Sequence, residues 1–140
     1  LCCLLAAVWL SSAVAGGRVY HASVPAVVDH VHDGDTVIVA VPSWPAIVSP
    51  IQVRIYGIDT AELHDPRPEI RAQAELARDW LAAHLRPGDA VTLKNVRRDK
   101  YSRLLASVEA TVDGETRDVA SEMVRRGLAK SYNGQGIKPW

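Results

Sequence analysis

Short stretches of β-branched residues recur along the chain, and their spacing predicts five strands. Four valines between residues 24 and 31 give the first stretch this character. Asp-Gly-Asp at 33–35 is a turn signal that joins the first two stretches into a hairpin. Apolar and polar side chains alternate at 51–58, as in a strand with one buried face. The predicted strands are residues 21–32, 36–41, 51–58, 90–96 and 104–112.

Two segments have helical spacing. Residues 69–85 place an apolar side chain on one stripe at about every fourth position, after Pro68 and before Pro-Gly at 87–88. Residues 119–126 predict a shorter helix, with Asp118 as its N-cap and a glycine directly after its end. Five short strands with one main helix between the third and the fourth predict an α+β, mainly β fold, a five-stranded OB-type barrel. Short strands also fit an SH3-like barrel, and the position of the helix favours the OB type.

The first fifteen residues are almost wholly apolar and end in Ala-Val-Ala. This composition predicts a secretory signal peptide at 1–15, with its charged beginning missing and a small-residue cleavage site. The alternative is a membrane anchor, which needs about 20 apolar residues. Cys2 and Cys3 both lie in this segment. We therefore expect residues 16–140 to form one cysteine-free domain, secreted or periplasmic, with no stable membrane insertion after cleavage.

Charge is balanced along the chain. There are 16 Lys and Arg residues against 16 Asp and Glu, and none of them precedes Arg18. A protein that binds nucleic acid through overall basicity carries an excess of Lys and Arg. If this chain acts on nucleic acid, the positive charge must be local, or a bound cation must supply it.

Two carboxylates lie at strand ends that a barrel brings to one rim. Asp35 begins the second predicted strand, and Asp59 closes the third. Two carboxylates with a backbone carbonyl and waters suit Ca²⁺ better than Zn²⁺. Asp-Gly-Asp by itself is more often only a turn.

Two arginines and a glutamate have the right chemistry to accompany such a site. Guanidinium groups at Arg54 and Arg103 can clamp a phosphate if they face one pocket. A carboxylate at Glu62, close to a metal, can orient or deprotonate a water. Taken singly, each has an ordinary interpretation: Arg54 pairs with a cross-strand carboxylate, Arg103 faces solvent, and Glu62 is a solvated loop residue.

Read together and in order, these residues resemble the staphylococcal nuclease (thermonuclease) family in its compact form. The resemblance runs from about residue 24 to residue 130. Its most specific motif is the second, because one spacing joins an arginine, a metal ligand and a base. The four motifs are Asp-Gly-Asp-Thr at 33–36, Arg-x₄-Asp-Thr-x-Glu at 54–62, Asp-Lys-Tyr-x-Arg at 99–103 and Gly-Leu-Ala-Lys at 127–130.

The resemblance implies a role for each matching position. The implied Ca²⁺ ligands are Asp35, Asp59 and the backbone carbonyl of Thr60, with Asp33 close behind. The implied catalytic residues are the general base Glu62 and the phosphate-binding pair Arg54 and Arg103. The implied substrate contacts are Lys100 and Tyr101 at the nucleotide's terminal phosphate and Tyr132 as a base-stacking aromatic, one position earlier than in the family.

The function implied is that of a secreted, calcium-dependent endonuclease. Its expected substrates are DNA and RNA, with single strands preferred, and its products end in 3′-phosphate. We expect a monomer. The alternative is a non-catalytic OB module that binds nucleic acid or protein. The chain departs from the family at Ala61, where proline is frequent, so Glu62 is expected to be held less rigidly. It also departs at Ser102, where glycine is frequent.

Overall fold

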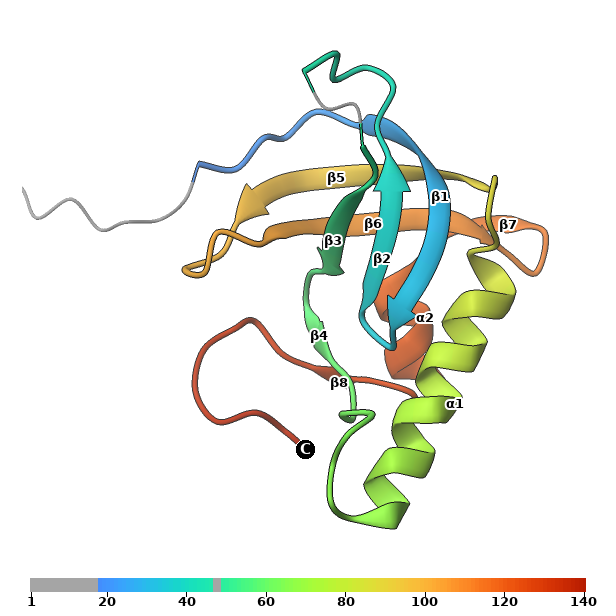
Figure 1. Ribbon diagram of the computed structural model, residues 1–140, viewed down its shortest axis with the longest axis vertical. Coiled ribbons are helices and arrows are strands. Elements are labelled where there is room, and N and C mark those ends of the chain that lie inside the picture. Colours follow the sequence, from blue (N-terminus) through green and yellow to red (C-terminus); the bar gives the residue numbers. More distant parts are fainter. Residues whose placement is uncertain (1–17, 47–48) are drawn as a thin grey trace, which may run out of the picture.

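Five strands close into a small barrel (Figure 1). They pair in the order β3-β2-β1-β5-β6, with antiparallel neighbours, and a parallel pairing of β3 with β6 closes the ring. The closed mixed barrel confirms the predicted OB-type fold. The strands are β1 (Val24–Asp33), β2 (Thr36–Ala40), β3 (Ile51–Ile55), β5 (Ala90–Arg98) and β6 (Leu104–Val112). This computed structural model describes residues 18–46 and 49–140, so the predicted signal peptide at 1–15 lies outside the described residues.

Two helices and three short strands complete the chain. Helix α1 (Pro68–His84) lies between β4 and β5 in sequence, so the main helix falls between the third and fourth barrel strands as predicted. Helix α2 (Val119–Arg125) begins at the expected N-cap, where the Asp118 carboxylate accepts a hydrogen bond from the backbone of Ser121. None of the helices in the described residues is long and apolar enough to cross a bilayer. The short strands are β4 (Ile58–Asp59), β7 (Glu115–Asp118) and β8 (Lys130–Ser131).

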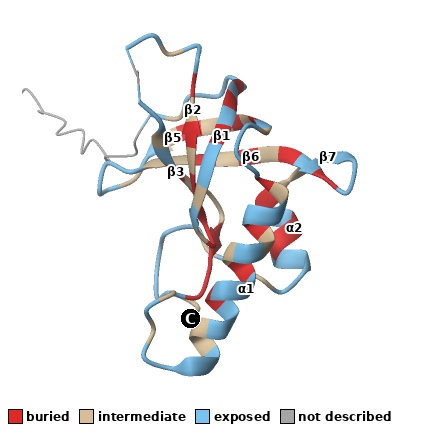
Figure 2. Cartoon of the chain, turned by 45° about the vertical axis from the view of Figure 1, so that its right-hand side comes forward, coloured by how far each residue is buried: buried red, intermediate tan, exposed pale blue. Residues whose placement is uncertain are grey.

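The core lies inside the barrel and beneath α1. Figure 2 shows buried positions alternating with exposed ones along β1, as the period of a strand requires. In α1 the buried residues Ala74, Ala77 and Leu81 lie three or four positions apart, on the side that faces the barrel. Most barrel side chains are valines, whose branched shape fills a narrow interior. Covering one end of the barrel with α1 therefore buries the helix stripe and the barrel interior together.

Three boundaries differ by two or more residues from the prediction. The first strand was expected from residue 21, but β1 begins at Val24. The third strand was expected to reach Ile58, but β3 ends at Ile55. Gly57 has a φ of +91°, a left-handed conformation that breaks the strand, and the chain then pairs as β4 with β8. The fourth barrel strand continues to Arg98 because its last residue still pairs with Leu104 of β6. The connection between β5 and β6 is thus residues 99–103.

The helix stripe gives a test of the packing. Leu81 is fully buried between α1 and the barrel, so Leu81→Ala should lower the free energy of unfolding by about 2–5 kcal/mol. Leu76 lies on the same helix and is 55% exposed, so Leu76→Ala should change it by less than about 0.5 kcal/mol. Urea denaturation monitored by circular dichroism measures both. Equal effects would contradict the assigned helix face.

Candidate functional site

The two aspartates of the predicted metal site meet beneath the β1–β2 turn. Asp35 and Asp59 are 3% and 2% exposed. The turn is drawn in by Gly34, because a Cβ at this position would lie 2.8 Å from the Thr60 hydroxyl and 3.0 Å from the Cβ of Ala77. Only glycine fits this contact, and it presses the turn against both the Asp59 segment and α1. The barrel therefore brings together two carboxylates that lie 24 positions apart.

Arg54 bridges these carboxylates. It lies opposite Thr36 in the β2–β3 pairing, which aims its side chain at the rim where β2 begins. Its Nη1 donates to Asp35 Oδ1 at 2.7 Å, and its Nη2 donates to Asp59 Oδ1 at 2.9 Å. The ordinary interpretation, a cross-strand ion pair, is therefore present in the structure. Because one guanidinium faces two buried carboxylates, the cluster keeps an excess of negative charge.

Burial is the largest influence on the pKa of Asp35. Removal from water raises the pKa of its carboxyl to about 6, against the opposing effect of Arg54. This value also includes the negative charges of Asp33 and Asp59, which raise the pKa, and a hydrogen bond from the Thr36 hydroxyl, which lowers it. The ionised form of Asp35 is thus destabilised by burial and by its acidic neighbours. Perturbed pKa values of this kind are frequent at functional sites.

The loop after Asp59 places Glu62 at a cavity that Asp35 and Arg54 also line. This cavity, of about 250 Å³, is lined by Asp35, Arg54, Thr60 and Glu62, with His32 and His64 on its border. Thr60 is buried, whereas the Glu62 side chain is 67% exposed. We name this space the aspartate cavity. It gathers three of the implied roles, which are metal ligand, phosphate contact and base.

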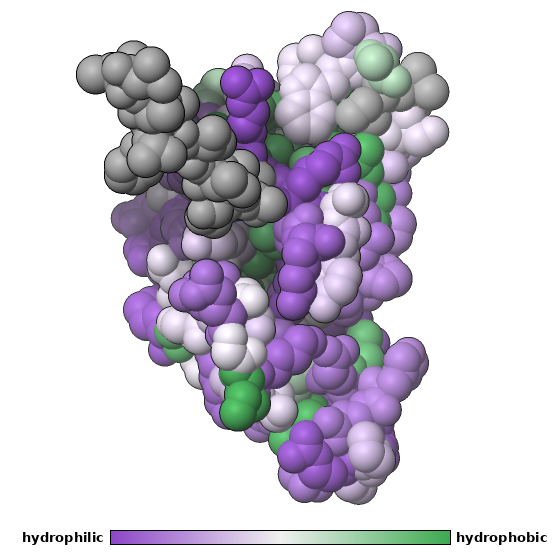
Figure 3. Space-filling view, turned by 90° about the vertical axis from the view of Figure 1, so that its left-hand side faces the viewer, coloured by the Kyte–Doolittle hydropathy of each residue, from purple (hydrophilic) through white to green (hydrophobic). Residues whose placement is uncertain are grey.

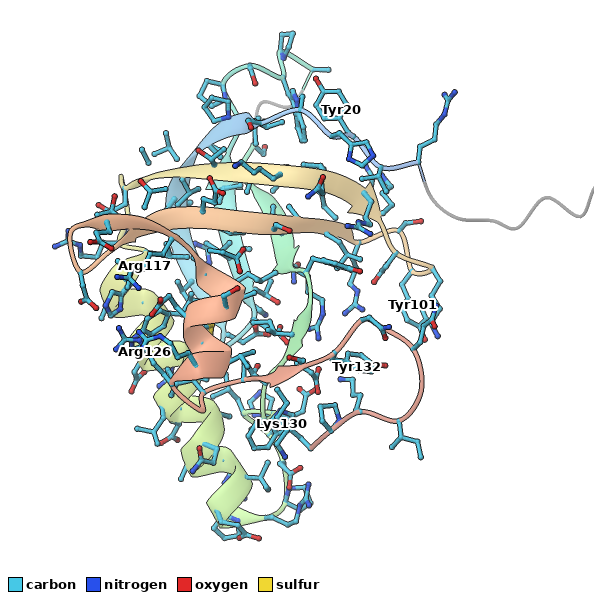
Figure 4. All side chains as sticks on the ribbon, turned by 180° about the vertical axis from the view of Figure 1, so that it is seen from behind. Tyr20, Tyr101, Arg117, Arg126, Lys130 and Tyr132 are labelled. Atoms are coloured by element: carbon cyan, nitrogen blue, oxygen red, sulfur yellow. The ribbon has the colours of Figure 1, made fainter. Side chains whose placement is uncertain are left out.

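Arg103 and the implied substrate contacts line a neighbouring cavity of about 450 Å³. Lys100, Tyr101, Arg103 and Tyr132 all border it, and Arg54 lines both this space and the aspartate cavity. We name it the tyrosine cavity. Figure 4 shows Tyr101 on the β5–β6 connection and Tyr132 on the C-terminal tail, on the same side of the molecule.

The β5–β6 connection is a built turn. The Asp99 carboxylate accepts hydrogen bonds from the backbone of Tyr101 and of Arg103. It also accepts one from Arg103 Nε at 2.7 Å. Burial raises the pKa of Asp99, but the bonds from the Arg103 backbone, the Arg103 side chain and the Tyr101 backbone together outweigh it, so the pKa is lowered. The Arg103 side chain is 51% exposed. Its guanidinium is thus positioned by Asp99 and still open to a ligand.

The C-terminal tail adds contacts that sequence reasoning missed. Lys138 Nζ lies 2.9 Å from Glu62 Oε1 and 3.7 Å from Asp59 Oδ1, and the hydrogen bond to Glu62 raises the pKa of Lys138. The Trp140 indole donates to the Asp59 backbone carbonyl at 3.0 Å, and Lys130 Nζ lies 4.0 Å from the centre of its ring. Since Lys138 is 76 positions from Glu62, no local pattern signals the pair. The tail thus fastens the segment that bears Asp59 and Glu62.

The sequence matches the staphylococcal nuclease homologue family over residues 52–138. This chain belongs to the staphylococcal nuclease family. The probable endonuclease lcl3 of Emericella nidulans is 39% identical over 89 residues, which cover 59% of this chain and 31% of that protein. Endonuclease YhcR of Bacillus subtilis is 32% identical over 113 residues, which cover 76% of this chain and 9% of that protein. The chain therefore spans less than a third of either relative.

The family match begins after the β1–β2 turn. Arg54, Asp59, Glu62 and Arg103 lie inside the matched residues, and Asp35 lies before them. The bond from Arg54 Nη1 to Asp35 Oδ1 places this aspartate with the nuclease-family residues independently of the match. The roles of these residues stay predictions, and the structure supplies their shared location.

The raised pKa of Asp35 predicts a pH-dependent stability. Because its folded-state pKa of about 6 lies above the unfolded value of 3.8, Asp35 by itself lowers the free energy of unfolding as the pH rises from about 4 through 6. Asp35→Asn removes this charge, so it should raise the urea midpoint at pH 7.5 in chelator, and the gain should vanish near pH 4. Asp79→Asn, at a side chain that is 67% exposed, serves as the control. A destabilised Asp35→Asn protein at pH 7.5 would contradict the burial argument.

Proposed function

We propose that this chain is a calcium-dependent endonuclease that hydrolyses phosphodiester bonds in DNA and RNA. The observation that carries the proposal is the convergence of Arg54, Glu62 and the buried Asp35 on one cavity, with the buried Asp59 bonded to the same arginine. Similarity to proteins named endonucleases supports the same reaction class. A binding module without catalysis has no need for a carboxylate base beside a phosphate-binding arginine.

The donor set fits a hard divalent cation. Asp35, Asp59 and the backbone carbonyl of Thr60 would hold Ca²⁺ through oxygen atoms alone. Within residues 18–46 and 49–140, no three His, Cys, Asp or Glu side chains gather closely enough to hold a metal. The third protein ligand is the backbone carbonyl that the family resemblance implies at Thr60. When bound, the ion supplies positive charge that offsets the charge of the substrate phosphate.

The arginines and Glu62 divide the remaining work. Arg54 uses two of its five N–H donors on the aspartates, which leaves others for a phosphate oxygen, and Arg103 binds the same group from the tyrosine cavity. Glu62 takes a proton from a water molecule while the oxygen of that water forms a bond to phosphorus. The bond from phosphorus to the 5′ oxygen breaks, water protonates that oxygen, and a 3′-phosphate remains. Charge on the transition state is met by both guanidinium groups.

Lys138 sets how Glu62 is presented. Its ammonium group bonds Oε1 of Glu62. The other oxygen of that carboxylate accepts no hydrogen bond from the described part of the chain, so it can receive a water. Ala61 led us to expect a less rigid Glu62 loop, because the family more often has proline there. The contact with Lys138 restrains this loop in another way.

Single strands are the proposed preferred substrate. The aspartate and tyrosine cavities are small, and Tyr101 and Tyr132 offer rings on which an unpaired base can stack. With no net charge, the chain attracts phosphate only through this local cluster. Binding should therefore be weak away from the site and sensitive to salt.

Secretion and a monomeric state are also proposed. The apolar residues 1–15 support export to the periplasm or the medium. On α1 the large exposed apolar residue is Leu76, and a single one does not make a stable interface.

Hydrolysis of heat-denatured DNA tests the central proposal. The purified protein should cleave in calcium and stop in chelator. Glu62→Gln should lower kcat by about 10²–10⁴ through loss of the base, and Arg54→Ala by at least about 10² through loss of a phosphate contact. Glu75→Gln on α1 and Arg86→Ala after it replace exposed residues outside both cavities, and both should keep full activity. A folded protein that binds DNA and does not cleave it would support the non-catalytic OB module instead.

Metal binding is tested separately from activity. Calcium at 100 times its dissociation constant should stabilise the wild-type protein by about 2.7 kcal/mol, because only the folded state holds the site. Asp35→Asn and Asp59→Asn should lose this gain, and Asp79→Asn should keep it. Differential scanning calorimetry with and without calcium gives the answer. Equal gains in all four proteins would remove these two aspartates as ligands.

A further inference from the structure

A third cavity lies beside the two arginines and has no part in the mechanism above. It measures about 310 Å³ and is lined by Trp44, the first residues of β3 and the start of β6. Arg54 and Arg103 line this cavity and also the tyrosine cavity. We name it the tryptophan cavity. Its lining comes from the β2–β3 connection, at the top of Figure 1, and from the β5–β6 connection, at the left, as well as from the strands.

The tryptophan and tyrosine cavities follow one another along β3. The first takes its lining from Ile51 to Arg54, and the second takes it from Arg54 to Ile58. On β6, Leu104 lines the first cavity and Leu105 the second, in the same order. A phosphate bound by Arg54 and Arg103 therefore has one cavity on each side. A nucleic acid strand has the same order, with a nucleotide on each side of every internal phosphate.

The chemistry of the tryptophan cavity matches a nucleobase. Trp44 is half-buried, packs against the core with one part, and gives the cavity a planar aromatic surface. Ile51 and Leu104 add apolar walls, and Gln52 and Ser102 add hydrogen-bonding groups. Figure 3 shows this side of the molecule, where hydrophilic side chains border a hollow with apolar atoms inside it. Aromatic surface framed by cationic and amide groups is what an unstacked base binds.

Arg98 adds a third positive charge to the same cavity. Its Nη1 donates to the backbone carbonyl of Ser102 at 2.7 Å, which holds the side chain across the β5–β6 connection. Arg54 and Arg103 also line the cavity, but their guanidinium groups are paired with carboxylates, Arg54 with Asp35 and Asp59 and Arg103 with Asp99. Among the described residues, Arg98 has no carboxylate partner. Its charge favours an anionic ligand over a neutral aromatic one.

We propose that the tryptophan cavity is a subsite for the nucleotide that flanks the scissile phosphate on the side away from the tyrosine cavity, with its base stacked on Trp44. This subsite rests on the proposed nuclease function and extends it. The protein then grips two consecutive nucleotides of a single strand, and Arg98 contacts the phosphate beyond them. A duplex has to unstack both bases to bind in this way.

Oligonucleotide binding tests the subsite. A fluorescent single-stranded hexamer is titrated in calcium into Glu62→Gln protein, with the wild type assayed beside it for cleavage. A set of hexamers carries one abasic site at each position in turn. Trp44→Leu in the same background keeps apolar volume at the barrel end and removes the stacking surface. It should weaken binding of the intact hexamer by about five- to a hundred-fold, and Trp44→Phe should restore most of the affinity.

The abasic series separates stacking from packing. Removal of the base that occupies the subsite should weaken binding to the parent protein and have no further effect on the Trp44→Leu protein, because both changes delete one contact. Leu76→Ala is the control for loss of apolar surface. Arg98→Gln, which keeps Trp44, should reduce the slope of log affinity against log salt by about 1. This variant also carries the test if Trp44→Leu does not fold.

Each outcome decides between the two levels of the proposal. Cleavage by the wild type with unchanged binding in the Trp44→Leu and Arg98→Gln proteins overturns the subsite and leaves the nuclease function standing. Affinity lost equally for every abasic hexamer on Trp44→Leu means that Trp44 only supports the barrel, and this also overturns the subsite. A wild-type protein that neither binds nor cleaves any hexamer overturns both.

Discussion

The ion pairs of Arg54 with Asp35 and Asp59 are the interactions on which the site depends. Their carboxylates come from segments that meet only because the barrel closes, and both are nearly inaccessible to water. Two buried negative charges repel each other, and one guanidinium offsets only part of that cost. Burial also raises the pKa of Asp35, and the Lys138 ammonium, 3.7 Å from Asp59 Oδ1, adds a second positive charge to the cluster. Stability is thus held below its optimum at the place where function is proposed.

The rest of the fold serves to hold this arrangement. The parallel pairing of β3 with β6 fixes Arg54 beside the strand that begins next to Arg103. Gly34 lets the β1–β2 turn contact both the Thr60 segment and α1, so the main helix supports the site directly. The tail, which passes below β3 and β4 in Figure 1, ties the same segment down through Lys138 and Trp140. Elements from across the whole described chain therefore position one cavity.

A chain with no net charge can still place basic side chains together in one region. Arg54 and Arg103 border two adjoining cavities on one side of the barrel and are paired there with Asp35, Asp59 and Asp99, whereas Arg98 beside them has no carboxylate partner among the described residues. On the other side, the buried Glu122 pairs with Arg117 and Arg125, and these bonds lower its pKa to about 2. The basic residues there are used for structure. Net charge alone thus says little about where a phosphate would bind.

The sequence by itself determined the five barrel strands, both helices and the residues that match the family motifs. Periodicity and turn residues are local, so they can be read directly from the order of the residues. It did not determine where β3 ends, because Gly57 breaks that strand only in combination with the pairing of β4 and β8. The sequence also did not predict the contact of Lys138 with Glu62 or the position of Trp44 beside Arg54 and Arg103. These depend on closure of the barrel and on the path of the tail, and contacts between residues so far apart are set by tertiary packing.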